Sequence, residues 1–217
     1  TIMIPTASKT FKSLGTVNTI AVFDVDGRDA LNEIEAKITE LDDQFSIFKT
    51  DSDISRLNAN AGVWPVSVGL DTIRLLDKAK RLSQLSEGAF SVTSGPLTAL
   101  WRRKLNKGEI PDLAEIKASR ALICDKDITL ADKAGMAKLN KTGQAVDLGG
   151  IAKGYAVDTA KNILIKHGIC DALINFGGTV AVLGSAKIVG IQHPDKSTGI
   201  SMGKLSVGNG KSVVTSG

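Results

Sequence analysis

The feature that most constrains the fold of this chain is an alternation along the sequence. Long segments with helical spacing of apolar residues alternate with short segments rich in β-branched residues. The first long segment has apolar residues at intervals of three and four: Leu31, Ile34, Ile38, Leu41 and Phe45. A second helix is predicted over 70–85, and a third begins at Ala152. Strands are predicted over 16–23, 172–178, 180–183, 187–193 and within 204–214. Short strand pairs between long helices predict an α+β fold, with a largely antiparallel sheet packed against two or three long helices.

The middle of the chain carries weaker signals. We expect a short helix near 54–58, a strand over 63–68 and a short helix over 97–105. Residues 106–116 contain Gly108 and Pro111 and are predicted to be a loop. A small hairpin is predicted from 128–130 and 137–140.

Composition narrows the class of protein. The 217 residues, 42% of them apolar, can bury a core, and we expect one domain over 1–217. The net charge of +4 comes from dispersed lysines, so no nucleic-acid partner is expected. Cys124 and Cys170 are too far apart for a zinc knuckle, and two cysteines are too few for a disulfide scaffold.

The cellular location of the protein is predicted from the hydropathy of the sequence and from its N-terminal residues. No window approaches the ~20 consecutive apolar residues of a membrane helix, so no transmembrane segment is expected. The sequence does not begin with Met, and residues 1–10 lack a signal-peptide core, so we expect a processed or trimmed start. We expect a cytoplasmic protein, with an exported or membrane-tethered form as the alternative.

A glycine turn before the third helix is the strongest candidate for a binding site. Asp147 is followed by Leu148, Gly149 and Gly150, and the helix then begins. A helix start attracts anions such as phosphate, and Lys153 would add a full positive charge. The alternatives are a connection that only packs the helix on the preceding strand, and a helix-capping role for Asp147.

Other catalytic motifs are excluded or weak. Asp24-Val25-Asp26-Gly27 matches the strand end of haloacid-dehalogenase-type phosphatases, but Arg28 replaces their usual Thr, and Asp-Gly is also a strong turn former. The glycine turn lacks the GK[ST] ending of a Walker A loop and does not match GxGxxG. His167 and His193 are the two histidines, too few to favour a histidine triad or metal site.

Taken together, an ordered series of motifs resembles the ApbE-like family of FAD:protein FMN transferases, whose fold is T-fold-related. The series comprises Ser13-Leu14-Gly15-Thr16, Phe45-Ser46-Ile47-Phe48, Asp51 to Asn58, Gly88-Ala89-Phe90, Gly95-Pro96-Leu97, Asp147 to Asp158, Asn175-Phe176-Gly177-Gly178, Gly190 to Pro194 and Thr215-Ser216-Gly217. The resemblance implies a Mg²⁺-dependent enzyme that splits FAD, transfers FMN to a Ser or Thr hydroxyl of an acceptor flavoprotein and releases AMP. The alternatives are a relative that binds or hydrolyses FAD without transfer and, remotely, the phosphatase built on Asp24 and Asp26.

The resemblance also implies site residues. The FAD site would be formed by Leu14, Phe48, Ala89, Phe90, Ser91, Asp147 and Lys153. Phe48 would provide an aromatic face for stacking, and the main-chain carbonyl of Gly150 would be one Mg²⁺ ligand. No catalytic residue is assigned.

Three departures from the family pattern stand out. Ser91 occupies a position where the family often has Asp, which alters a polar contact. The loop before Gly190 lacks a tryptophan-containing segment. The sequence ends at Gly217, so we expect that the C-terminal portion of the family, with further metal ligands, is missing from it.

Overall fold

The computed structural model describes residues 4–197 and 199–215. The chain forms two compact units, one from residues 1–40 and 153–217 and the other from residues 41–152. We refer to these as the first and second unit. The expectation of a single domain over 1–217 stays a prediction.

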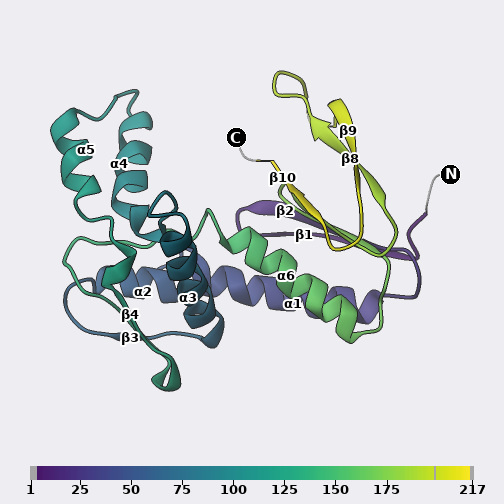
Figure 1. Ribbon diagram of the computed structural model, residues 1–217, viewed down its shortest axis with the longest axis horizontal. Coiled ribbons are helices and arrows are strands. Elements are labelled where there is room, and N and C mark those ends of the chain that lie inside the picture. The colour runs from purple at the N-terminus through teal and green to yellow at the C-terminus, as the bar shows by residue number, and fades with distance from the viewer. Residues whose placement is uncertain (1–3, 198, 216–217) are drawn as a thin grey trace. The chain divides into compact units, whose positions relative to one another are not determined.

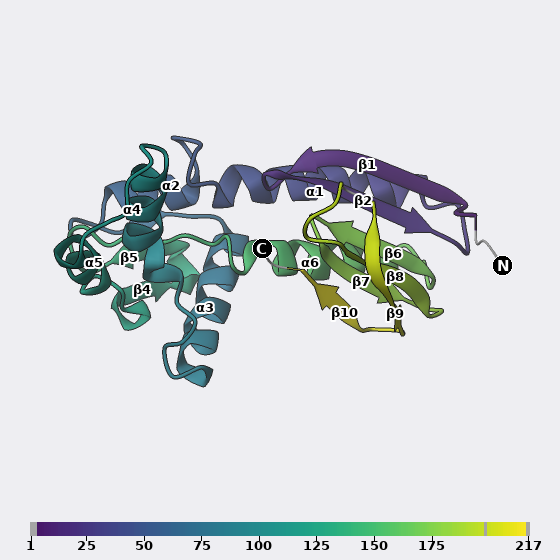
Figure 2. The same cartoon turned by 90° about the horizontal axis from the view of Figure 1, so that it is seen from above.

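A five-stranded antiparallel sheet is the centre of the first unit. Its strands are β1 (Ala7–Ser13), β2 (Thr16–Val22), β6 (Ala172–Phe176), β7 (Thr179–Leu183) and β10 (Ser212–Val214). Their order in the sheet is β1-β2-β6-β7-β10, so β1 and β10 form the two edges (Figure 2). Strands β8 (Lys187–Gln192) and β9 (Ser201–Val207) pair separately as a two-stranded antiparallel ribbon.

Helices α1 (Arg28–Phe45) and α6 (Ala152–Lys166) cover one side of this sheet, and the β8–β9 ribbon extends from the other side (Figure 1). The α1 residues Leu31, Ile34 and Ile38 are buried, as are Ile20 and Phe176 of the sheet. Burying each such side chain stabilises the fold by about 1.5–3 kcal/mol. The predicted apolar stripe of α1 is therefore the face that forms the core.

Two-residue turns set the register of the sheet. Leu14 and Gly15 connect β1 to β2, and Gly177 and Gly178 connect β6 to β7. All four residues have positive φ, as type I′ hairpin turns require. At Gly177 a Cβ would also lie 2.3 Å from the Thr16 hydroxyl oxygen, so only glycine fits there.

The second unit is mainly helical. It contains α2 (Asp53–Ala59), α3 (Leu70–Leu85), α4 (Gly95–Leu105) and α5 (Leu113–Arg120). A three-stranded antiparallel sheet has the order β3-β5-β4, with β3 at Val66–Ser67, β4 at Ile128–Ala131 and β5 at Met136–Leu139. Its core includes Ile54, Leu57, Leu75, Leu76, Ile128 and Leu139.

The predicted fold class is confirmed, because every strand pairing among the described residues is antiparallel and long helices pack with the sheets. Three local predictions were incomplete or wrong. Strand β1 was missed, and the strand over 63–68 contracts to Val66–Ser67. The loop over 106–116 contains the start of α5, where Asp112 and Glu115 form a capping box, a signal that was readable in the sequence.

Within the part of the chain that the structure describes, no helix is both long and apolar enough to cross a membrane.

Candidate functional site

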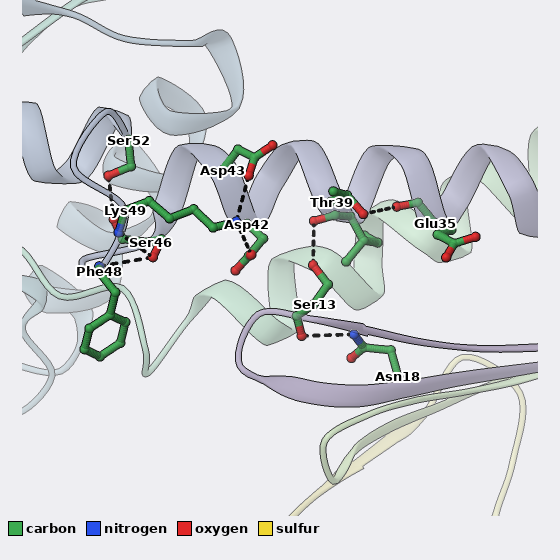
Figure 3. A network of polar contacts seen from close by, with 11 residues as sticks. Ser13, Asn18, Glu35, Thr39, Asp42, Asp43, Ser46, Phe48, Lys49 and Ser52 are labelled. Atoms are coloured by element: carbon green, nitrogen blue, oxygen red, sulfur yellow. Dashed lines mark hydrogen bonds and ion pairs between the residues drawn. The ribbon is translucent and has the colours of Figure 1, made fainter.

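Phe48 projects from the turn that follows α1. The Ser46 hydroxyl oxygen accepts hydrogen bonds from the backbone N–H groups of Phe48 (3.1 Å) and Lys49 (3.3 Å). The Lys49 ammonium reaches back to the carboxylates of Asp42 and Asp43, and the Phe48 ring points away from this network (Figure 3). Phe48 is 77% exposed, so an ordered turn presents an open aromatic face.

Asp147 is held by two hydrogen bonds to its carboxylate. One oxygen accepts from the Gly149 N–H at 2.9 Å, and the other accepts from the Thr98 hydroxyl at 3.2 Å. The backbone N–H of Asp147 donates to the Val92 carbonyl at 2.8 Å. The carboxylate therefore closes the glycine turn that precedes α6 and also joins this turn to α4.

Arg102 was missed by the sequence reasoning, and it connects two predicted site residues. Its guanidinium lies 5.1 Å from the centre of the Phe48 ring, and Nη2 lies 3.8 Å from the Asp147 carboxylate. No motif marks Arg102, because it is one of several basic residues near the end of α4. Phe48, Arg102 and Asp147 form a row that we call the aromatic–arginine–carboxylate row.

The backbone before Asp147 is clamped by long-range contacts. The Asn58 amide accepts from the Val146 N–H at 2.7 Å and donates to the Val146 carbonyl at 2.9 Å. Gly95 approaches the same segment so closely that a Cβ would lie 2.5 Å from the Ala145 carbonyl oxygen. Together these contacts fix the backbone just before Asp147.

The predicted segment 89–91 lies partly beside the glycine turn. Ala89 is exposed, and the Phe90 ring faces Gly150, where a Cβ would lie 3.4 Å from the ring edge. The Ser91 hydroxyl donates to Asp125 at 2.7 Å. Phe90 is therefore placed by the structure next to the turn that carries Asp147.

Asp125 is a buried carboxylate that is held by Ser91 and Thr93. One Asp125 oxygen accepts from the Ser91 hydroxyl, from the Thr93 N–H at 3.0 Å and from the Thr93 hydroxyl at 2.7 Å. Asp125 is 6% exposed, and its other oxygen has no hydrogen-bond partner in the described part of the chain. Ser91 and Asp125 also line a pocket of about 490 Å³, together with Lys80, Gly88, Cys124 and Lys126.

Leu14 and Lys153 belong to the first unit. Leu14 lies at the tip of the β1–β2 hairpin with φ of +53°, which is strained for a residue with a side chain. Lys153 is the second residue of α6 and half-buried, and no hydrogen bond or ion pair of its side chain occurs among residues 4–197 and 199–215. A lysine at a helix start opposes the helix dipole, which suggests a role other than stabilising α6.

Three later motifs converge in the first unit. One pocket of about 550 Å³ is lined by Asn175 of β6, Gly177 and Gly178 of the β6–β7 turn, Gly190 of β8 and Thr215. The Thr215 N–H donates to the Gly178 carbonyl at 3.0 Å. Ser216 and Gly217, which complete the last motif, lie outside the described residues.

The described residues do not by themselves form a magnesium site. Gly150 is exposed, as a carbonyl ligand would need to be. However, no group of three or more His, Cys, Asp or Glu side chains in the described ranges could hold a metal ion. Because Mg²⁺ takes near-octahedral oxygen ligation, one carbonyl is not sufficient.

The Asp24 and Asp26 motif has a structural explanation. The Asp24 carboxylate accepts from the backbone N–H groups of Cys170 (2.6 Å) and Asp171 (3.2 Å), and Asp26 pairs with Arg28 at 2.6 Å. The parallel sheet that a haloacid-dehalogenase-type site needs is absent from the described pairings. The turn interpretation therefore accounts for these residues.

Comparison with known proteins identifies relatives along almost the whole chain. The ApbE family model matches residues 14–217. An FAD:protein FMN transferase of Klebsiella pneumoniae is 35% identical over 83% of this chain, and one of Vibrio cholerae is 31% identical over 73%. The aligned parts make up 56% and 48% of those two proteins, so the chain spans about half the length of the curated relatives it matches.

Solved structures agree with this assignment. The flavin transferase ApbE from Vibrio cholerae has a TM-score of 0.75 and 28% identity, over 87% of this chain and 64% of that one. The ApbE protein of Thermotoga maritima, at 24% identity, shares the fold with a TM-score of 0.79 over 94% of this chain and 68% of its own. With the family model matched from Leu14 onward and the predicted motifs in order, the chain belongs to the ApbE family.

Proposed function

We propose that this chain is the FAD-binding part of an FAD:protein FMN transferase, acting on a Ser or Thr hydroxyl of an acceptor flavoprotein. The observation that carries the proposal is the family match over residues 14–217. The relatives named FAD:protein FMN transferase support flavin transfer as the general activity.

The proposed roles follow from the chemistry of the residues. Phe48 offers an open aromatic face on which the isoalloxazine ring stacks. Phe90 lies beside Gly150 and extends the apolar surface at the glycine turn. Asp147 accepts hydrogen bonds from the dinucleotide, and Lys153 balances the charge of its pyrophosphate.

The reaction needs positioning and charge neutralisation more than a protein nucleophile. The acceptor hydroxyl oxygen attacks the phosphorus on the riboflavin side of FAD and forms a new P–O bond. The bond from that phosphorus to the bridging oxygen breaks, and AMP leaves with the bridging oxygen. The hydroxyl proton passes to a base that we do not assign.

The second candidate is a relative that binds or hydrolyses FAD without transfer. It uses the same proposed FAD site and differs from the transfer reaction in the acceptor alone, since both reactions break the same bond of the pyrophosphate. In hydrolysis, water replaces the acceptor hydroxyl, and free FMN forms together with AMP.

Product analysis distinguishes the two functions. The protein is incubated with FAD, Mg²⁺ and an acceptor that carries a Thr-containing flavinylation motif, and the acceptor is weighed by intact mass spectrometry. We expect covalent FMN on the acceptor and an equal amount of AMP. Free FMN and AMP with an unlabelled acceptor would support hydrolysis, and intact FAD would contradict both reactions.

The dependence on Mg²⁺ and the cytoplasmic location are parts of the proposal that need their own tests. The same assay with EDTA, then with added Mg²⁺, tests the metal requirement. Cell fractionation with an antibody to this chain tests the location, with the exported or membrane-tethered form as the alternative.

A further inference from the structure

We infer that Arg102 is a further flavin-dinucleotide-binding residue, whose guanidinium contacts the pyrophosphate of FAD. This inference rests on the proposed function, because it assigns a residue to the same site. It concerns a side chain that lies between Phe48 and Asp147 and that no sequence motif marks.

Arg102 is held in place but keeps its donors available. Its guanidinium lies over the Phe48 ring at 5.1 Å and at 3.8 Å from Asp147, beyond hydrogen-bond distance. No side-chain hydrogen bond of Arg102 occurs in the described part of the chain, and its side chain is 45% exposed. A planar guanidinium has five N–H donors and binds phosphate oxygens in pairs, so it is suited to a diphosphate.

The charge of Asp147 supports this role. If the pyrophosphate lies at the glycine turn, it brings negative charge towards the Asp147 carboxylate, which already accepts from Gly149 and Thr98. The negative charges of the pyrophosphate and of the Asp147 carboxylate would repel each other. A cation placed between them would offset this repulsion. Among the described residues, Arg102 is the cation that pairs with Asp147.

A purely stabilising role for Arg102 fits the geometry less well. Exposed ion pairs contribute little to stability, and this one is long. A cation over an exposed aromatic ring likewise adds little to stability. Substitution of Arg102 should therefore leave the fold intact, which makes the inference testable by binding.

The test compares FAD with riboflavin, which has the ring system but no phosphate. Both are titrated into the wild type, Arg102→Gln, Arg102→Lys and the control Arg103→Gln, and flavin fluorescence is followed. Arg103 is the adjacent residue on α4 and is also exposed. Thermal unfolding of each variant checks that it is folded.

We expect Arg102→Gln to weaken FAD binding by about 10- to 100-fold, as for loss of a charge-assisted contact, and to change riboflavin binding less than about threefold. Arg102→Lys should lie between, because it keeps the charge but loses the paired donors. Arg103→Gln should bind both flavins as the wild type does.

If Arg102→Gln weakened the binding of FAD and of riboflavin equally, the contact between Arg102 and phosphate would be overturned. The role left for Arg102 would be to hold the Phe48 ring in place. Unchanged FAD binding in that variant would overturn the inference while the proposed function stands. A wild type that binds neither flavin would overturn the proposed function and this inference with it.

Discussion

At the scale of single residues, Leu14 combines a strained backbone with a predicted place in the FAD site. Its φ of +53° is the left-handed region, which costs a non-glycine residue about 1–2 kcal/mol. Strain of this kind is often kept where a side chain is needed for function.

We predict that Leu14→Gly stabilises the protein by about 1 kcal/mol, because glycine adopts positive φ without strain. If the Leu14 side chain contacts FAD, the same variant should bind FAD several-fold more weakly. Thermal unfolding and a fluorescence titration measure the two effects. Tighter or unchanged FAD binding would remove Leu14 from the predicted site.

Gly177 presents the opposite case. A side chain there would be strained at φ of +54° and would collide with Thr16. Gly177→Ala should therefore lower the free energy of unfolding by about 1–3 kcal/mol, measured by urea denaturation. Gly208→Ala is a matched control, since no atom lies within 4 Å of a Cβ at that position. A stable Gly177→Ala variant would show that the hairpin tip can move.

At the scale of elements, the start of α6 brings a lysine to the first turn of a helix. Lysine is unfavourable there, and no partner compensates it in the described part of the chain. We predict that Lys153→Ala weakens FAD binding by about tenfold without loss of thermal stability, because it removes charge beside the pyrophosphate. Lys161→Ala, on the same helix, is the control. Unchanged FAD affinity in a titration of Lys153→Ala would exclude the assignment.

A part-buried ion pair near the starts of β6 and β8 should make stability depend on pH. Lys187 is 7% exposed, pairs with Asp171 and lies over the Phe23 ring at 4.6 Å. Burial raises the pKa of Asp171, but hydrogen bonds from Lys187 and Ser185 outweigh that effect, so its pKa lies below the ordinary value.

Because the folded pKa of Asp171 is lowered, the stabilisation is present above the ordinary aspartate pKa of ~3.9 and is lost as pH falls towards the folded value. We expect the wild type to lose stability in this acid range in urea titrations. Asp171→Asn should be less stable near neutral pH and show a flatter acid limb. If the free energy of unfolding of Asp171→Asn fell with decreasing pH as steeply as that of the wild type, other carboxylates would be responsible for the loss of stability in acid.

At the scale of the whole molecule, the chain spans about half the length of its curated relatives, 56% and 48% of the two described above. Its described residues contain no cluster of metal-binding side chains. We therefore predict that EDTA leaves the thermal unfolding of this chain unchanged, even if the transfer reaction needs Mg²⁺. A clear fall in the midpoint with EDTA, restored by Mg²⁺, would reveal a structural metal site.

Two kinds of feature could be predicted from the sequence: those that depend on a pattern within one segment, and those that depend on several motifs taken together. The helices α1, α3 and α6 were predictable because each has a long apolar stripe, and such periodicity survives in most tertiary settings. The family was predictable because several motifs occur in order, although each motif alone is weak. The short strand β3 was misjudged because its apolar pattern is too brief. Helix α5 buries no residue and so has no apolar stripe, which leaves the capping box of Asp112 and Glu115 as its signal in the sequence.

The sequence by itself therefore determined the α+β class, the main helices and the family, since these depend on patterns along the chain. Only the tertiary structure decided which side chains meet at the site. Asn58 clamps Val146 from 88 positions away, and Asp125 supplies a carboxylate to Ser91 from 34 positions away. Arg102 joins Phe48 to Asp147 for the same reason. Such contacts result from how helices and turns pack, and no local pattern encodes that packing.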